Sequence, residues 1–232
     1  MEATENTELK EVKREVVTPG EVIVSGKDYL PGDGTRREGD DIVASKFGLV
    51  DIGGRAVKVI PLSGTYMPRF GNVVIGIVTD VTFNGWLIDI KGPYSSFLPL
   101  VETPRFIKGD LKEFFDIGDM MACKIVGVKQ KGVDLSIKFN GLGKLEEGIV
   151  IFINSNKVPR VIGKEGSMIK LIKDETNCEI IVGQNGVVWI RGDSLEDELR
   201  AKEAILFVVE KSFAIGLTEK VQEFLKERRA KK

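Results

Sequence analysis

The chain has 232 residues, of which 42% are hydrophobic, with a net charge of −1 and no histidine. This length suits about two or three small domains with hydrophobic cores, and no apolar run reaches the roughly 18 residues of a membrane-spanning helix. The absence of histidine excludes Ser-His-Asp and Cys-His catalysis and histidine-ligated metals, and the near-neutral charge means that any nucleic-acid site must be a local patch.

The N-terminal residues 1–8 are acidic and polar, so we expect no signal or transit peptide and a cytoplasmic protein. Cys123 and Cys178 lie in separate apolar runs, which predicts two reduced thiols in hydrophobic cores. No Cys-x-x-Cys pair occurs, so a zinc ribbon is excluded, and we expect no metal and no cofactor.

After an acidic lead-in over residues 1–15, short β-like runs alternate with Gly, Pro and Asp. This punctuation predicts a small N-terminal β domain over residues 16–65. Its glycine-rich loop, residues 29–37, is expected to be exposed. Two interpretations of Arg36 and Arg37 in this loop stay open, namely ordinary solvated charges and a functional role.

Residues 66–140 carry five longer strand-like runs, with an irregular excursion before the fourth. Five strands in this arrangement predict an OB-type barrel. The runs span residues 73–81, 85–90, 96–100, 121–129 and 132–139.

From residue 144 the pattern changes to alternating strands and helices. Two helical segments flank a Gly-x-x-Gly turn, two strands join through a hairpin at residues 183–186, and a capping box at residues 194–197 opens a long helix. This order of elements is that of a type I KH domain. We therefore predict a KH domain over residues 144–216 and a C-terminal helix with a basic tail over residues 217–232.

The Gly-x-x-Gly turn is the most specific motif of the chain. Loops of this kind clamp the backbone of a single strand in KH domains, because glycine lets backbone N–H groups approach a phosphate closely. The flanking helix ends add partial positive charge. The turn also suits a tight connection between two helices, and Glu165 would repel a phosphate, so both interpretations stay open. The predicted RNA-binding residues of this loop are Arg160, Gly163, Lys164, Glu165, Gly166 and Lys170.

A second candidate site lies on the predicted barrel. OB-type barrels bind single strands on the face of their second and third strands, through aromatic stacking beside basic residues. Trp86 and Tyr94 suit either base stacking or a place in the core, and both interpretations stay open. We expect Phe83 in the core because apolar neighbours flank its strand. Acidic residues are interleaved with the basic ones, which also fits ordinary solvated charges. The predicted residues of this face are Asn84, Trp86, Lys91, Tyr94, Arg105, Lys108 and Lys112.

The predicted barrel, with Gly71–Gly76 at its start and Phe83–Trp86 at its first hairpin, resembles a ribosomal S1-type RNA-binding domain. An N-terminal β domain, an S1 domain and a KH domain in this order resemble the RNA-binding cap subunits of the archaeal exosome. The motif at residues 183–186 resembles the Gly-x-Asn-Gly signature of the KH domain in this family. The resemblance covers residues 16–215, with motifs at residues 18–21, 29–34, 66–76 and 183–190.

This resemblance implies a multidomain fold, mainly β plus α/β, with an OB-fold (S1) barrel and a type I KH domain. It implies a non-catalytic subunit that binds single-stranded RNA and has no membrane partner. Three copies would form a trimeric cap on a hexameric ring of RNase-PH-like subunits, with the N-terminal domain as the main ring contact. The cap would guide RNA 3′ ends into the ring, which degrades and processes RNA by phosphorolysis. Three weak sites around one pore would act through avidity.

Two other functions are open. A nuclease would need clustered carboxylates to hold metal ions, whereas the Asp and Glu residues here are spread through loops and helix faces. A free-standing translation or ribosome-assembly factor with S1 and KH domains would carry the same motifs. Co-purification with a six-membered ring would separate this factor from a cap subunit.

Overall fold

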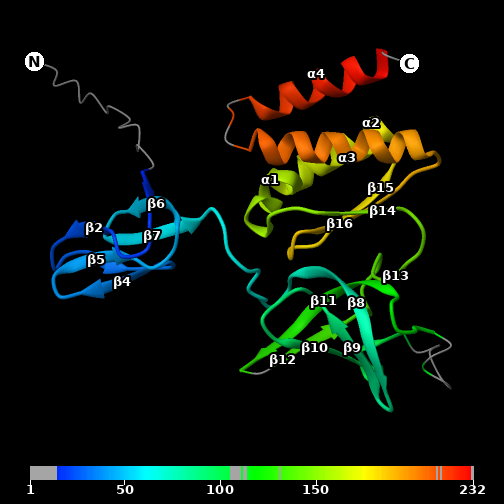
Figure 1. Ribbon diagram of the computed structural model, residues 1–232, viewed down its shortest axis with the longest axis horizontal. Coiled ribbons are helices and arrows are strands. Elements are labelled where there is room, and N and C mark those ends of the chain that lie inside the picture. The colour runs from blue at the N-terminus through cyan, green and yellow to red at the C-terminus, as the bar shows by residue number, and fades with distance from the viewer. Residues whose placement is uncertain are drawn as a thin grey trace, which may run out of the picture. The chain divides into compact units, whose positions relative to one another are not determined.

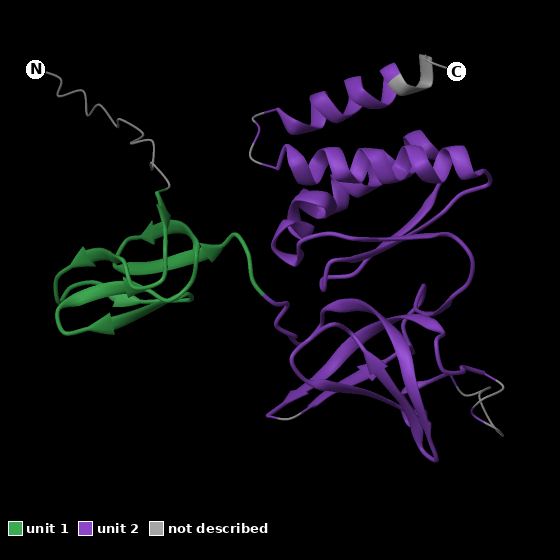
Figure 2. Ribbon diagram, viewed as in Figure 1, with its two compact units in different colours: residues 1–64 green, residues 65–232 purple. Residues whose placement is uncertain are grey.

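The computed structural model describes residues 15–104, 111, 114–130, 132–212, 214 and 216–230. The chain divides into two compact units, residues 1–64 and residues 65–232 (Figure 2). Within the described ranges, each helix is too short or too polar to cross a membrane. The domain boundaries drawn above, including the separate C-terminal segment, stay predictions.

Unit 1, drawn green in Figure 2, consists of two small β-sheets. Alternate side chains turn to a common core, as in β7, where Val57 and Val59 are buried and Lys58 between them is exposed. Gly, Pro and Asp interrupt the strands and keep them short. The first sheet has the order β1 (Val16–Val17), β6 (Gly48–Gly53), β7 (Ala56–Pro61) and β3 (Leu30–Pro31), and the second has the order β2 (Val22–Ser25), β5 (Asp41–Ala44) and β4 (Thr35–Glu38).

Arg36 and Arg37 lie on β4, within the stretch that the sequence analysis treats as a loop and open site. Arg36 forms an exposed ion pair with Glu38 at 2.6 Å, and Arg37 donates a hydrogen bond to the carbonyl oxygen of Tyr29. An exposed pair of this kind contributes roughly 0–1 kcal/mol. Local contacts within unit 1 therefore account for both arginines.

Residues 73–136 form the predicted five-stranded barrel, which is confirmed (Figure 1). The strands pair in the order β12-β10-β9-β8-β11, and β12 also pairs with β11, which closes the barrel. Register shifts between Val78 and Asp80 and between Ile125 and Gly127 bend the two longest strands around the core. The strands are β8 (Val73–Thr82), β9 (Gly85–Asp89), β10 (Ser95–Pro99), β11 (Met120–Lys129) and β12 (Gly132–Ser136), and β13 (Gly143–Leu145) pairs with the first residues of β11, on the edge opposite β8.

The KH fold follows the barrel, and its predicted order of elements is confirmed. Helices cover one face of a three-stranded sheet of order β14-β16-β15 (Figure 1). In α2 the buried residues Met168, Ile172 and Thr176 recur every four residues, which places one helix face on the core. The elements are β14 (Ile149–Phe152), α1 (Val158–Ile162), α2 (Ser167–Thr176), β15 (Glu179–Val182), β16 (Val187–Arg191) and α3 (Leu195–Glu210).

Helix α4 (Leu217–Ala230) extends the helical layer of the KH fold. Val221 and Leu225, one turn apart, are buried in the same core as α3. Phe224 stacks on Phe207 of α3 with ring centroids 4.7 Å apart. At the other end of α3, the Ser194 hydroxyl accepts a hydrogen bond from the Asp197 backbone N–H and donates one to the Asp197 carboxylate, so Ser194 is the N-cap of the helix as predicted.

Candidate nucleic-acid interface

The Gly-x-x-Gly turn joins α1 to α2 through a left-handed backbone. The φ angles are 76° at Gly163, 54° at Glu165 and 80° at Gly166. A Cβ on Gly163 would lie 2.7 Å from both Cβ and the backbone N of Met168, whereas a Cβ on Gly166 would meet nothing within 4 Å. Gly163 is therefore required by space and conformation, and Gly166 by conformation alone.

The charged residues predicted for this loop are exposed to solvent. Arg160 lies on α1, Lys164 and Glu165 lie in the turn, and Lys170 lies on α2. Within the described part of the chain, no ion pair involves any of these four side chains. They are accordingly free to meet a charged ligand, with Glu165 opposing a phosphate.

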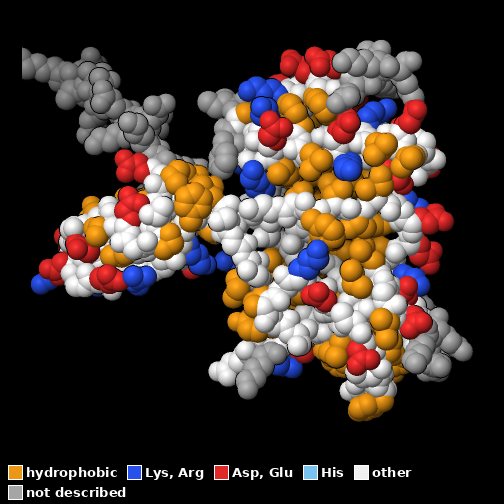
Figure 3. All heavy atoms as spheres, in the orientation of Figure 1, with side chains coloured by type: hydrophobic (Ala, Val, Ile, Leu, Met, Phe, Trp, Pro, Cys, Tyr) orange, Lys and Arg blue, Asp and Glu red, His pale blue; other side chains and the backbone are white. Residues whose placement is uncertain are grey.

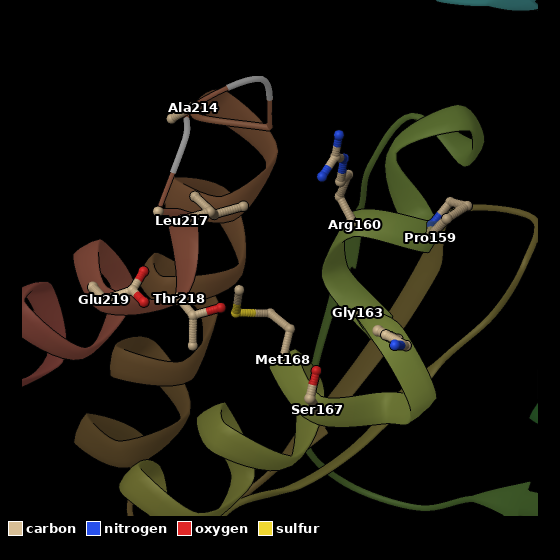
Figure 4. A pocket seen from close by; sticks show the side chains of 11 residues that line it. Pro159, Arg160, Gly163, Ser167, Met168, Ala214, Leu217, Thr218 and Glu219 are labelled. Carbon is tan, nitrogen blue, oxygen red and sulfur yellow. The ribbon is translucent and has the colours of Figure 1, made fainter. Parts of the chain in front are cut away.

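A hollow of about 540 Å³ lies between this turn and the start of α4 (Figure 4). Arg160 and Lys164 line it from the KH loop, and Lys170 does not. The sequence pattern does not predict that the start of α4 lies beside this loop, because this arrangement depends on how α4 packs on α3. The α4 side is lined by Ala214, Gly216, Leu217, Thr218 and Glu219.

The barrel hairpin reverses two sequence-based expectations. Trp86 is completely buried, its ring meets Phe115 edge to face at 5.1 Å, and its indole N–H donates to the Phe115 carbonyl oxygen at 3.0 Å. The prediction that Trp86 stacks on RNA bases is therefore wrong. Phe83, which we expected in the core, has 94% of its surface exposed.

The hairpin register explains both errors. Thr82 pairs with Gly85, so Phe83 and Asn84 form the turn and are not part of the alternating strand. Trp86 is the second residue of β9 and points into the barrel. Figure 3 shows a hydrophobic group at the lower tip of unit 2, where Figure 1 places the end of this hairpin.

The other predicted barrel residues that the structure describes, apart from Lys91, are Asn84 and Tyr94, and their surroundings differ. Asn84 is exposed in the turn beside Phe83, and its carbonyl oxygen accepts a hydrogen bond from the Leu100 N–H at 2.9 Å. Tyr94 is half-buried and packs against the barrel core. Three predicted residues lie outside the described part of the chain, namely Arg105, Lys108 and Lys112.

Lys91 lies where the barrel meets the KH sheet. Its backbone is left-handed, with φ 55°, and its Nζ sits 3.4 Å above the centroid of the Phe152 ring on β14. A cation over an aromatic face stabilises by roughly 0.5–2 kcal/mol. The Lys91 ammonium therefore has a partner within the protein, although the residue remains exposed.

The hairpin Gly183–Gly186 docks the KH sheet on the barrel. The Asn185 side-chain amide donates to the carbonyl oxygens of Ile75 at 2.7 Å and Ile90 at 2.9 Å, and its oxygen accepts from the Ile75 N–H at 3.3 Å. A Cβ on Gly186 would lie 2.2 Å from the Ile153 carbonyl oxygen, so this position has room only for glycine. The sequence analysis treats this segment as a hairpin and a family motif, and the structure adds its role as the joint.

Apolar side chains surround this polar joint. Trp189, on the KH sheet face away from the helices, is 4% exposed and packs with Ile75 and Ala122 of the barrel. The Trp189 indole N–H donates to the Glu147 carbonyl oxygen at 2.7 Å. The barrel and the KH fold thus share one small core within unit 2.

Both cysteines are free and buried, as predicted. Burial raises the pKa of Cys123 to about 12 and also raises that of Cys178. Across the described ranges, no three Cys, Asp or Glu side chains come together in a way that could hold a metal ion.

Comparison with known proteins places these features in a family. Residues 148–207 match the KH domain family, and residues 16–52 match the family described as the exosome complex exonuclease RRP4 N-terminal region. The chain is 45% identical over 214 residues to exosome complex component Rrp4 of Methanothermus fervidus, covering 92% of this chain and 96% of that protein. It is 44% identical over 220 residues to exosome complex component Rrp4 of Pyrococcus furiosus, covering 91% and 83%.

A solved structure supports the same assignment. A crystal structure described as an exosome complex RNA-binding protein aligns with a TM-score of 0.64 and 30% identity, covering 72% of this chain and 98% of that one. The predicted resemblance to exosome cap subunits is confirmed at the level of the family. The chain belongs to the Rrp4 family of exosome complex components.

Proposed function

We propose that the protein is a non-catalytic, RNA-binding component of a cytoplasmic exosome. It acts as a cap that recruits single-stranded RNA 3′ ends and guides them into a phosphorolytic ring. The main support is the combination of two exposed nucleic-acid elements, the KH loop and the Phe83 hairpin, in a chain whose relatives carry the name exosome complex component Rrp4.

On the barrel, Phe83 takes the stacking role that the sequence analysis gave to Trp86. An aromatic side chain that is 94% exposed at a hairpin tip gains no stability from the fold, so a partner explains it better than packing does. A base stacked on such a ring contributes roughly 1–3 kcal/mol and requires no sequence preference. The neighbouring Asn84 amide is exposed for hydrogen bonds to the same strand.

Unit 1 supplies the contact to the ring. Large apolar side chains are exposed on its strands and in the bend before β6, and an exposed apolar surface in a small domain indicates a protein partner. The exposed side chains are Val16, Val22, Leu30, Phe47, Ile52 and Ile60. Three copies on a six-membered ring would bring three weak RNA sites around one pore and raise the effective concentration of each for the strand.

Reconstitution tests this proposal. The purified chain is mixed with ring subunits of the RNase-PH type, and the mass of the complex is measured by size-exclusion chromatography with light scattering. We expect three copies per six-membered ring and faster phosphate-dependent decay of 3′-tailed RNA than with the ring alone. Failure to associate would favour the free-standing translation or ribosome-assembly factor.

The chain alone provides the control for catalysis. Incubated with labelled RNA, Mg²⁺ and phosphate, it should leave the RNA intact. Degradation that co-elutes with the purified chain, and not with a contaminating ring, would show that the protein is a nuclease.

A further inference from the structure

We propose that Phe152, on the KH sheet, stacks on a base of single-stranded RNA and so continues the RNA-binding face of the barrel onto the KH fold. This inference rests on the proposed RNA-binding function and goes beyond it, because Phe152 lies neither on the barrel nor in the Gly-x-x-Gly turn. Phe152 is the last residue of β14, and 58% of its surface is exposed. A large aromatic side chain that gains so little burial from the fold is better explained by a partner than by packing.

One face of the Phe152 ring is covered and the other is open. The Lys91 Nζ lies 3.4 Å from the ring centroid, so its ammonium covers one face. Since more than half of Phe152 is exposed even so, the opposite face is open to a second flat group. Nucleic-acid bases suit this face, because every base has a π surface, and a cation beside the ring attracts the phosphates of the same strand.

Phe152 lies on the side of the KH sheet that faces the barrel. Side chains alternate along a strand, and Ile151 is buried in the core beneath the helices, so Phe152 turns to the opposite face of the sheet. Figure 3 shows hydrophobic side chains with a basic group beside them across the middle of unit 2, where Figure 1 places β14 between the helices and the barrel. A strand bound on the barrel can therefore reach Phe152 without crossing the helical layer.

The outer face of the barrel leads from Phe83 to this ring. Strand β9 begins two residues after Phe83 and ends two residues before Lys91, and its 5 residues span about 16 Å at about 3.3 Å per residue. Between the two ends, Leu87 of β9 lies opposite Phe97 of β10, and both side chains are half-buried on the outer face. A site of about 4–16 nucleotides, the range of OB folds, is long enough to include both ends.

The charges at this joint favour an anionic partner. Lys91 and Arg69 are exposed, and neither is in an ion pair among the residues that the structure describes. Arg69 follows Pro68, whose Cγ would lie 3.4 Å from a Cβ on Gly92, so the segment with Arg69 runs beside the Lys91 loop. The Asp89 carboxylate opposes an anion here, and it accepts a hydrogen bond from the Lys91 backbone N–H at 2.7 Å. Two cations and one acid beside an open aromatic ring suit a nucleic-acid strand better than an apolar protein surface.

The test measures the affinity of the full chain for a fluorescein-labelled oligoadenylate of about twelve nucleotides by anisotropy. Phe152→Ala should weaken binding about fivefold or more, which is the smaller loss expected for one stacked base. Phe152→Leu keeps an apolar side chain without the π face and should lose about as much, whereas Phe152→Trp should bind at least as tightly as wild type.

Phe139→Ala is the matched control. Phe139 is 44% exposed and has the Lys124 Nζ 4.1 Å from its ring centroid, but it lies beside β11 and not beside β9. Its loss should change the affinity by less than about twofold, because it is away from the path between Phe83 and Phe152. If Phe139→Ala loses as much affinity as Phe152→Ala, removal of any exposed aromatic ring explains the effect and the inference is wrong.

The remaining outcomes separate RNA binding from other roles of Phe152. If the Phe152 variants lower the melting temperature but leave the affinity of the folded protein unchanged, the ring only holds the KH sheet to the barrel. If they leave RNA affinity unchanged but weaken assembly with the ring subunits, the surface contacts protein. Either result would overturn the inference, and Phe152→Leu keeps the test decisive should the alanine variant not fold. If Phe83→Ala weakens binding and the Phe152 variants do not, the proposed function stands without this inference; if wild type does not bind, both fail.

Discussion

Asn185→Ala should destabilise the joint between the KH fold and the barrel, because the amide of this residue makes three hydrogen bonds across it. The side chain is 8% exposed and satisfies two carbonyl oxygens and one N–H, on Ile75 and Ile90. A buried polar group left without a partner costs about 1–3 kcal/mol. Both carbonyl oxygens and the N–H lose this partner, and water that enters the site offsets part of the cost. We therefore expect the free energy of unfolding to fall by about 3 kcal/mol, which lowers the melting temperature of a unit of this size by about 6–12 °C.

The assay is a thermal melt of the full chain followed by circular dichroism, with urea unfolding as a second measure. Asn185→Asp is the sharper variant, since one carboxylate oxygen still accepts from the Ile75 N–H while the other replaces the NH2 donor and faces two carbonyl oxygens. It should destabilise at least as much as Asn185→Ala. Asn84→Ala, at an exposed turn, serves as the control and should cost under about 0.5 kcal/mol. A similarly small effect of Asn185→Ala would refute the reasoning.

Three further substitutions test the site and its surroundings. Phe83→Ala should weaken oligoadenylate binding by about 1–3 kcal/mol without changing the melting temperature, measured by anisotropy and circular dichroism. Gly163→Ala should lower stability clearly more than Gly166→Ala, because only the first adds a contact with Met168 to the cost of a positive φ, and urea unfolding measures the difference. Burial raises the pKa of Tyr66 to about 12, so the unfolded state loses its proton first and stability falls as pH rises from about 10 to 12; Tyr66→Phe should flatten that part of the curve.

The fold was predictable where its signals are local. Turn residues mark the ends of the barrel strands, and the spacing of apolar residues along α2 marks its buried face. The N-cap at Ser194 and the hairpin at Gly183–Gly186 are likewise read from a few adjacent residues. Such features depend on backbone chemistry within one turn, so they do not require knowledge of the packing.

The barrel site was less predictable because a single residue of register changes which side chain is buried. Phe83 and Trp86 are both aromatic residues at one hairpin, and apolar neighbours alone could not say which belongs to the turn. The pairing of Thr82 with Gly85 decides it, since it leaves Phe83 in the turn and sends Trp86 inward. The bulge at Val78 also shifts the alternation along β8, which no simple period-two count anticipates.

Contacts between distant parts of the chain were beyond sequence reasoning. Lys91 reads as one basic residue among many, and only the packing of the KH sheet places Phe152 under its ammonium. The wall that α4 adds to the KH loop likewise follows from the packing of Phe224 and Val221 onto the α3 core. In both cases the surroundings of a basic residue depend on which distant element of the chain packs beside it.

The charges around the KH loop indicate how binding is shared between the two candidate sites. Glu165 in the turn and Glu219 across the hollow would oppose a phosphate, against Arg160 and Lys164, so we expect the loop to bind RNA weakly. Stacking on Phe83 involves no such repulsion, and it should therefore contribute more binding energy than the loop. It follows that Phe83→Ala should lose more affinity than Arg160→Gln at high salt, because phosphate contacts weaken there and stacking persists. At low salt the difference between the two losses of affinity should become smaller or change sign.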